Sequence, residues 1–135
     1  MTIDEDYVSY ELAKKLKECG FGDPCDSYYI KDNAPDGTAW IVPTTYREDF
    51  NADYDCPFCK PLCSAPTLAH AQKWLREKKH LSVEPYANIV ANFNYNIADL
   101  ESFADYKGLG IGYASYECAL AAGISASLEL IKKGE

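Results

Sequence analysis

The sequence predicts an α+β fold of two layers, in which three helices pack on one small antiparallel or mixed sheet in the order α-β-β-α-β-β-β-α. Three observations lead to this class. Three segments begin at capping residues and repeat apolar side chains at helical spacing, the segments between them have the composition of strands, and turn signals join neighbouring strands. Adjacent hairpin-like strands favour antiparallel pairing, with the helices packed on the sheet. A length of 135 residues suits one domain, residues 1–135, with a single core.

The first helix is predicted within residues 8–21, after a polar stretch at residues 1–7 that is expected to be frayed. Ser9 is the expected N-cap. The narrow apolar stripe of this helix consists of Leu12, Leu16 and Cys19. Gly20 is expected to end the helix in a left-handed conformation, which lets Phe21 fold back onto the helix in a Schellman motif.

A β-hairpin is predicted next. Residues 26–31 and 38–42 are rich in aromatic and β-branched side chains, and residues 32–37 between them are a dense turn signal. Pro43 is expected to end the second strand. Residues 44–62 show neither helical nor strand periodicity, so they are predicted to form a long loop. A loop of this length is uncommon in a compact domain and is often functional.

The central helix is predicted in residues 63–80, the stretch around which the rest of the chain is organised. Pro66 suits the first helical turn, and Ser64 or Thr67 can cap the free amides. The side chains expected to be buried are Leu68, Ala71, Trp74 and Leu75. The end of the stretch carries the positive charge that the helix dipole favours, on Arg76, Lys78, Lys79 and His80.

Three strands are predicted before the last helix. Residues 81–86 form an edge strand that Pro85 closes. Residues 87–95 alternate between two faces as a second strand, and residues 109–113 form a short third strand in which glycines alternate. The segment between them, residues 96–108, fits either a helical turn or a connection.

The last helix is predicted from Ser115, its N-cap, to the region of Gly134. One face is expected to carry Tyr116, Leu120, Gly123, Ile124, Ser127 and Ile131. Gly123 and Ser127 are small side chains in the middle of this face. They allow the helix axis to approach the sheet, or a partner, closely.

Composition and charge exclude several classes of function. The formal net charge of −8 repels a nucleic-acid backbone, so nucleic-acid binding is not expected. No apolar run approaches the roughly 18 residues that a membrane span needs, and residues 1–6 lack the pattern of an export signal. The six cysteines are therefore expected to be reduced thiols in a cytoplasm. No residue pattern indicates a catalytic site, so the sequence favours a non-enzymatic role.

Cys56, Cys59 and Cys63 are the candidate metal ligands. Their C-x2-C-x3-C spacing could hold Zn²⁺ if Cys19, Cys25 or a histidine supplied the fourth ligand. A second paired cluster, which a strong zinc motif has, is missing from the sequence. The same residues allow thiol–disulfide exchange, although no buried strand is expected before them and the prolines delay the helix. The third interpretation is three reduced cysteines in a loop.

The number of tyrosines points to a contact surface. The chain has eleven, more than a small core hides, and exposed tyrosines are common in protein interfaces. The side chains in question are Tyr28, Tyr29, Tyr46, Tyr54, Tyr95 and Tyr106.

Several stretches of the chain resemble a known group of proteins. They are the Cys-Gly-Phe end of the first helix, Pro-Cys-Asp-Ser-Tyr-Tyr at residues 24–29, and residues 64–77 and 113–124. Together they resemble small uncharacterised proteins of Bacteroides-type gut bacteria and their prophages, with the weakest similarity in residues 44–62. The resemblance implies a bacterial cytoplasm and a mobile-element origin. It brings no activity, cofactor or site residue with it.

Two hypotheses follow from the sequence. The first is a non-enzymatic protein-binding or accessory protein of prophage type, without a cofactor, that contacts a protein partner or forms a homo-oligomer through a tyrosine-rich and acidic surface. The alternative is a small zinc- or thiol-based protein that uses Cys56, Cys59 and Cys63.

Overall fold

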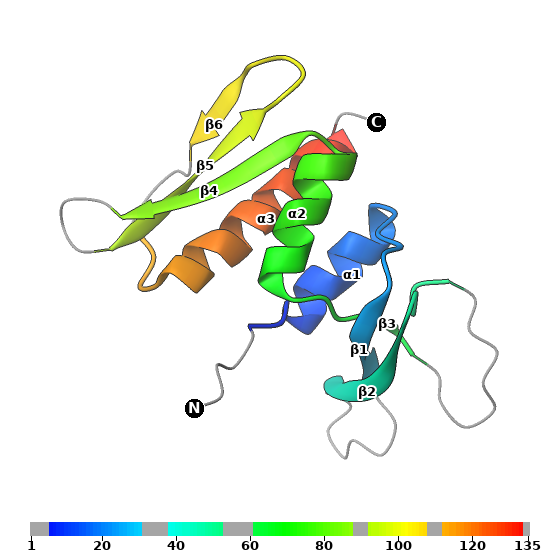
Figure 1. Ribbon diagram of the computed structural model, residues 1–135. Helices are drawn as coiled ribbons and strands as arrows, with labels where there is room; N and C mark the ends of the chain where they lie inside the picture. Colours follow the sequence, from blue (N-terminus) through cyan, green and yellow to red (C-terminus); the bar gives the residue numbers. More distant parts are fainter. Residues whose placement is uncertain (1–5, 31–37, 53–60, 88–91, 108–111, 134–135) are drawn as a thin grey trace. The chain divides into compact units, whose positions relative to one another are not determined.

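The computed structural model of the chain describes residues 6–30, 38–52, 61–87, 92–107 and 112–133 (Figure 1). The α+β class is confirmed, with three helices among the described residues. The strands form two three-stranded antiparallel sheets, where the sequence predicted one sheet. The chain divides into two compact units, an N-terminal unit of residues 7–67 and a C-terminal unit of residues 68–135 with residues 1–6. The expectation of one domain stays a prediction.

The N-terminal unit begins with helix α1 (Tyr10–Glu18), and its two predicted ends are confirmed. The amide of Leu12 donates a hydrogen bond to Ser9 Oγ at 3.2 Å, as an N-cap requires. At the other end Gly20 has φ +93°, and the amide of Phe21 reaches back to the carbonyl of Leu16 at 3.0 Å. This is the Schellman arrangement that the sequence predicts.

The predicted hairpin is also confirmed, and it forms part of the sheet β2-β1-β3. Strand β1 (Cys25–Ile30) pairs antiparallel with β2 (Trp40–Glu48). The expected loop over residues 44–62 is wrong at its start, because β2 continues past Pro43 to Glu48. A proline lacks the amide that a central strand would use, but β2 lies at the edge of its sheet, where this loss is tolerated.

The third strand is β3 (Cys63–Ser64). The sequence placed these two residues in the central helix, and that prediction is wrong, because the helix begins at Leu68. Asn51 explains the strand. Its side chain accepts from the amide of Ser64 at 2.8 Å and donates to the carbonyl of Phe21 at 2.8 Å. The Ser64 hydroxyl accepts from the amide of Phe50 at 2.9 Å. These bonds hold the chain extended before the helix. Residues 53–60, also expected to be loop, lie outside the described part.

The C-terminal unit contains helix α2 (Leu68–Lys78), strands β4 (Leu81–Ala87), β5 (Phe93–Asp99) and β6 (Asp105–Lys107), and helix α3 (Tyr116–Lys133). The strands form the antiparallel sheet β4-β5-β6, and α2 and α3 lie side by side against it (Figure 1). The four side chains expected to be buried on α2 are buried: Leu68, Ala71, Trp74 and Leu75.

The strand boundaries in this unit differ from the prediction. Pro85 does not end its strand, since β4 runs to Ala87 and lies at a sheet edge. The next strand is shifted towards the C-terminus, and the ambiguous segment contains the end of β5, a turn and β6. Residues 88–91 and 108–111, where parts of two predicted strands fall, lie outside the described residues, whereas Tyr113 pairs with Phe93.

The small residues of α3 meet the sheet of the same unit, as one of the two sequence interpretations expected. A Cβ atom placed on Gly123 would lie 2.5 Å from Val83 Cγ1 on β4 and 3.1 Å from Tyr95 Cγ on β5. Ser127 is buried, and its hydroxyl donates to the carbonyl of Gly123 at 2.9 Å. The Ser115 cap is confirmed by the hydrogen bond from the amide of Cys118 at 3.1 Å.

The N-terminal stretch that was expected to be frayed is paired where it is described. The carbonyl of Asp6 accepts from the amide of Leu68 at 2.8 Å, and Tyr7 forms a β-bridge with Thr67. Residues 1–5 lie outside the described part. The expectation of fraying stays a prediction.

Candidate functional site

The most unusual local structure lies in the C-terminal unit, at the corner where α2 ends and β5 turns into β6. We call residues 100–104 the β5–β6 turn. His80 has φ +59° and Phe103 has φ +62°, and among the described residues these are the non-glycine residues with positive φ. Residues held in sparsely populated backbone regions cluster at functional sites. The corner is therefore the first place to look for function.

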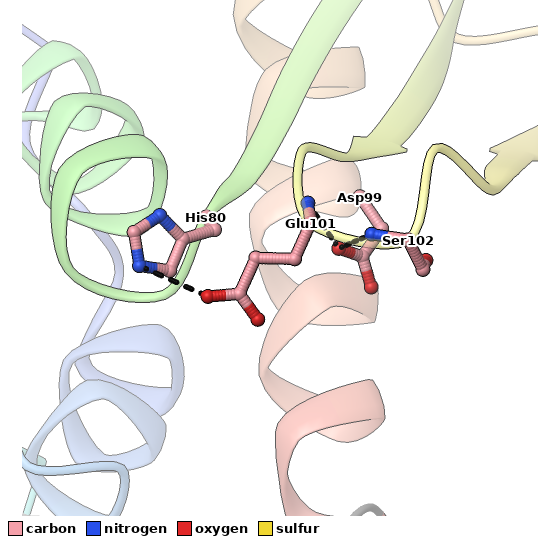
Figure 2. A network of polar contacts seen from close by, with 4 residues as sticks. All are labelled: His80, Asp99, Glu101 and Ser102. Atoms are coloured by element: carbon pink, nitrogen blue, oxygen red, sulfur yellow. Dashed lines mark hydrogen bonds and ion pairs between the residues drawn. The ribbon is translucent and has the colours of Figure 1, made fainter.

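Hydrogen bonds from Asp99 fix the β5–β6 turn. One oxygen of the Asp99 carboxylate accepts from the amides of Glu101 at 2.9 Å and Ser102 at 3.2 Å (Figure 2). The Asp99 amide donates to the carbonyl of Ala104, and the Asp99 carbonyl accepts from the amide of Phe103, both at 2.8 Å. The amides of Glu101 and Ser102 lower the pKa of Asp99 from its ordinary value of 3.8, so this carboxylate is charged at neutral pH.

His80 joins the turn to the end of α2. Its carbonyl accepts from the amide of Leu100 at 2.8 Å. Its Nε2 lies 3.3 Å from Glu101 Oε1, as Figure 2 shows. Both side chains of the second contact are exposed to solvent, so the pair adds little stability and requires a protonated histidine to be ionic. The backbone bond is the firmer of the two connections.

The turn displays a large apolar side chain to solvent. Phe103 is 89% exposed, the highest value among the large exposed apolar residues of the described part, and Leu100 beside it is 46% exposed. Isolated exposed apolar residues are common on protein surfaces. A phenylalanine that is almost wholly exposed and also has a left-handed backbone is uncommon, because bulky residues avoid that backbone region.

The turn that carries Phe103 is itself acidic, whereas the end of α2 at the same corner is basic, with Arg76 and Lys78 in its last turn. Residues 99–105 contain Asp99, Glu101 and Asp105 and no lysine or arginine. Glu101 and Asp105 are exposed. The corner therefore presents an exposed aromatic ring on a hydrogen-bonded turn, with charges of both signs on the segments that meet there.

The predicted metal ligands are described only in part. Cys63 is buried in β3, beside Tyr29 of β1, while Cys56 and Cys59 lie outside the described residues. In the described ranges no three His, Cys, Asp or Glu side chains are grouped so that they could hold a metal ion. The zinc hypothesis rests on residues that are not described and stays a prediction.

Two of the described thiols, Cys25 and Cys63, are poor nucleophiles in their surroundings. Burial raises the pKa of Cys63 to about 11, against the opposing effect of Lys17 and Lys14. Burial likewise raises the pKa of Cys25 to about 12, although Ser64 donates a hydrogen bond that lowers it. Thiol–disulfide exchange requires a thiolate, and both residues are neutral thiols at pH 7. No disulfide joins the described cysteines.

The tyrosine surface that the sequence predicted is smaller than expected. Tyr28 is buried, and Tyr29 is partly buried and donates from its hydroxyl to the Val8 carbonyl at 2.6 Å. Tyr95 is partly buried, and Tyr46 is exposed. Tyr54 and the side chain of Tyr106 lie outside the described part. Within the described ranges, the exposed large apolar side chains are Trp40, Tyr46, Tyr86, Leu100, Phe103 and Tyr116.

Sequence reasoning missed Phe103 and the turn around it. The segment from Asp99 was recognised only as a helical turn or a connection. A signal was present, because the side chain of an aspartate such as Asp99 can accept a hydrogen bond from the backbone amide two residues further on and so form an Asx turn. The left-handed conformation of Phe103 and its exposure could not be derived from that signal.

Comparisons with known proteins do not add a function. The chain matches no protein-family model, and the searches of curated proteins and of solved structures also give no match. The similarity to proteins of Bacteroides-type bacteria thus stays a prediction from the sequence. Within the described residues, no helix combines the length and apolar composition needed to cross a membrane.

Proposed function

We propose that this protein is a non-enzymatic binding or accessory protein of prophage type, which recognises another protein through exposed aromatic side chains on an acidic surface. The observation that carries the proposal is Phe103, 89% exposed on a hydrogen-bonded turn. Aromatic residues are enriched in protein interfaces, where one rigid ring buries a large area.

The charge of the chain supports a protein partner. A formal net charge of −8 is unfavourable for nucleic acid and favours partners with basic surfaces. Charge alone gives little binding free energy. The exposed apolar side chains can provide it, since aromatic residues buried at an interface contribute most of the binding free energy. The alternative is a zinc- or thiol-based protein. Cys63 is the member of its cysteine cluster that the structure describes, and it does not support this alternative, because burial keeps it a neutral thiol.

Affinity capture tests the proposal. The full chain with a cleavable tag is incubated with lysate of a Bacteroides-type bacterium, and retained proteins are quantified by mass spectrometry against a tag-only control. The expected result is a protein that is retained in constant ratio and that, when tagged itself, retains this chain. Sedimentation of the purified chain identifies a homo-oligomer. A chain that stays monomeric and retains nothing above the control would contradict the proposal.

A further inference from the structure

We infer that Gln72 and Pro85 close the outer edge of strand β4 to strand addition, so that a second copy of this chain does not extend the sheet β4-β5-β6 from that side. A sheet edge with free backbone groups pairs readily with another strand, and natural proteins block such edges. The inference concerns how self-association is prevented. It does not depend on the proposed function.

The first step is the direction of the backbone groups of β4. In antiparallel strands the amide and carbonyl of one residue point to the same side, and successive residues alternate. The Asp99 amide donates to the carbonyl of Ala104, which precedes β6, so Asp99 and every second residue before it on β5 point away from β4. Phe93 has the same direction, since its amide donates to Tyr113. The residues of β4 opposite these positions therefore point outward: Leu81, Val83, Pro85 and Ala87.

The second step is that Gln72 occupies one of the outward groups. Its side-chain amide, on α2, donates to the carbonyl of Val83 at 2.7 Å. Leu81 and Val83 are buried, and α2 packs against β4. A strand arriving at this half of the edge would have to displace both the hydrogen bond and the helix.

The third step is that Pro85 blocks the other half of the edge. Glu84, Tyr86 and Ala87 are exposed, so this half is open to solvent. Pro85 points outward there and has no amide to donate. An incoming strand would leave a carbonyl without a donor opposite Pro85, and burying an unpaired carbonyl is unfavourable.

Strand β2 repeats this arrangement in the other sheet. The Ala65 amide donates to the carbonyl of Ser27, so Ser27 points towards β3. Pro43 lies opposite Ser27 on β2 and therefore points outward. The register of β2 then shifts, and such a bulge also hinders strand addition. In the described ranges the other edge strands, β3 and β6, have only two and three residues.

Sedimentation velocity of the full chain tests the inference. Gln72→Ala combined with Pro85→Val frees the Val83 carbonyl and supplies an outward amide. The expected result is a dimer with an association constant about tenfold or more above that of the wild type, because a symmetric pair of β4 strands gains each restored group twice. Pro85→Val alone should give a smaller increase.

Hydrogen–deuterium exchange locates the contact in that dimer. The amides of β4, residues 81–87, should exchange more slowly than in the wild type, whereas those of β2, residues 40–48, should not change. Circular dichroism establishes that each variant is folded.

Glu84→Val is the matched control. It places the same side chain on an exposed neighbouring residue of β4, where it also removes a charge. The amide of residue 84 points towards β5, so this variant gains apolar surface but no outward donor. It should sediment like the wild type.

Three results would overturn the inference: a folded double variant that sediments like the wild type, association of Glu84→Val as strong as that of the double variant, or slowed exchange that lies outside residues 81–87. If the double variant does not fold, Pro85→Val alone decides by the same criteria. A wild-type chain that dimerises through residues 81–87 would overturn the inference as well.

Discussion

His80 and Phe103 share a left-handed backbone but differ in how well their side chains suit it. Histidine adopts this region several-fold more often than most residues. His80 lies two residues after the last residue of α2, where a left-handed conformation commonly ends a helix. Phenylalanine has no polar atom near the backbone that could compensate. The strain at Phe103 is therefore a local cost to stability.

Removing the Cβ atom at position 103 should stabilise the fold. We expect Phe103→Gly to raise the free energy of unfolding by about 0.5–1 kcal/mol relative to Phe103→Ala, because relief of the left-handed strain exceeds the entropy cost of glycine. Urea unfolding followed by circular dichroism measures the difference.

The alanine variant is the control for this change, since both variants lose the exposed ring. Phe103→Ala itself should stay within about 0.5 kcal/mol of the wild type, as exposed positions do. If glycine is less stable than alanine there, the backbone at Phe103 is not strained.

The buried cysteines permit a second prediction at this scale. With iodoacetamide at pH 8, the exposed Cys118 should be alkylated well before Cys25 and Cys63, because burial excludes the reagent and raises both pKa values, to about 12 and about 11. Peptide mapping by mass spectrometry gives the order. In denaturing urea the three should react at similar rates; equal rates in the native protein would contradict the burial of these thiols.

The pH dependence of stability follows from the same shifts. Folding raises the pKa of these thiols above their ordinary value of 9.0, so the unfolded state loses protons first. Their contribution to stability is complete below pH 9 and is lost as the pH rises towards 11–12.

Helices were the elements whose ends could be predicted closely. The caps at Ser9 and Ser115 and the stop at Gly20 involve residues three to five positions apart, so the sequence contains both partners of each hydrogen bond. Strands were less predictable. Pro43 and Pro85 were expected to end their strands. Both strands continue, because each lies at the edge of its sheet, where a missing amide is tolerated.

Gly123 gives a prediction at the scale of the helix. In a helix interior Gly→Ala normally stabilises, by up to about 1 kcal/mol. Here we expect Gly123→Ala to destabilise by about 1–3 kcal/mol, because the new Cβ would lie 2.5 Å from Val83 Cγ1 and α3 would have to move from β4. Thermal or urea unfolding measures the sign directly.

A double-mutant cycle identifies the cause of that effect. Val83→Ala removes the colliding atom, so the double variant should be less destabilised than the sum of the single variants, by about 1 kcal/mol. Additive effects would show that the cost of Gly123→Ala does not arise at Val83.

At the scale of the whole molecule, the main difference from the prediction is the division of the strands between two sheets. The third strand of the N-terminal sheet is β3, which has two residues. The side chain of Asn51 holds it in place by accepting a hydrogen bond from the amide of Ser64. The contact crosses 13 residues of sequence, and no local period marks it. Pattern reasoning therefore assigned Cys63 and Ser64 to the helix that follows.

For the candidate site at the β5–β6 turn, only the acidic composition could be predicted from the sequence. The sequence places three acids within residues 99–105, but it ranked the cysteines of residues 56–63 and a set of tyrosines above them. Most of the described tyrosines of that set proved buried or half-buried. Exposure is a property of packing, and the periodicity of one segment does not determine which neighbour covers it.

By itself the sequence determined the α+β class, the three helices with the N-caps of α1 and α3, the hairpin of the N-terminal unit and the acidic character of the chain, since each depends on neighbouring residues or on composition. Only the tertiary structure decided which strands pair, how far they extend past their prolines, and that Phe103 stands in solvent on a turn fixed by Asp99. Strand pairing and strand length arise from hydrogen bonds between segments distant in sequence, and the exposure of Phe103 depends on which segments pack over it, so a local pattern encodes neither.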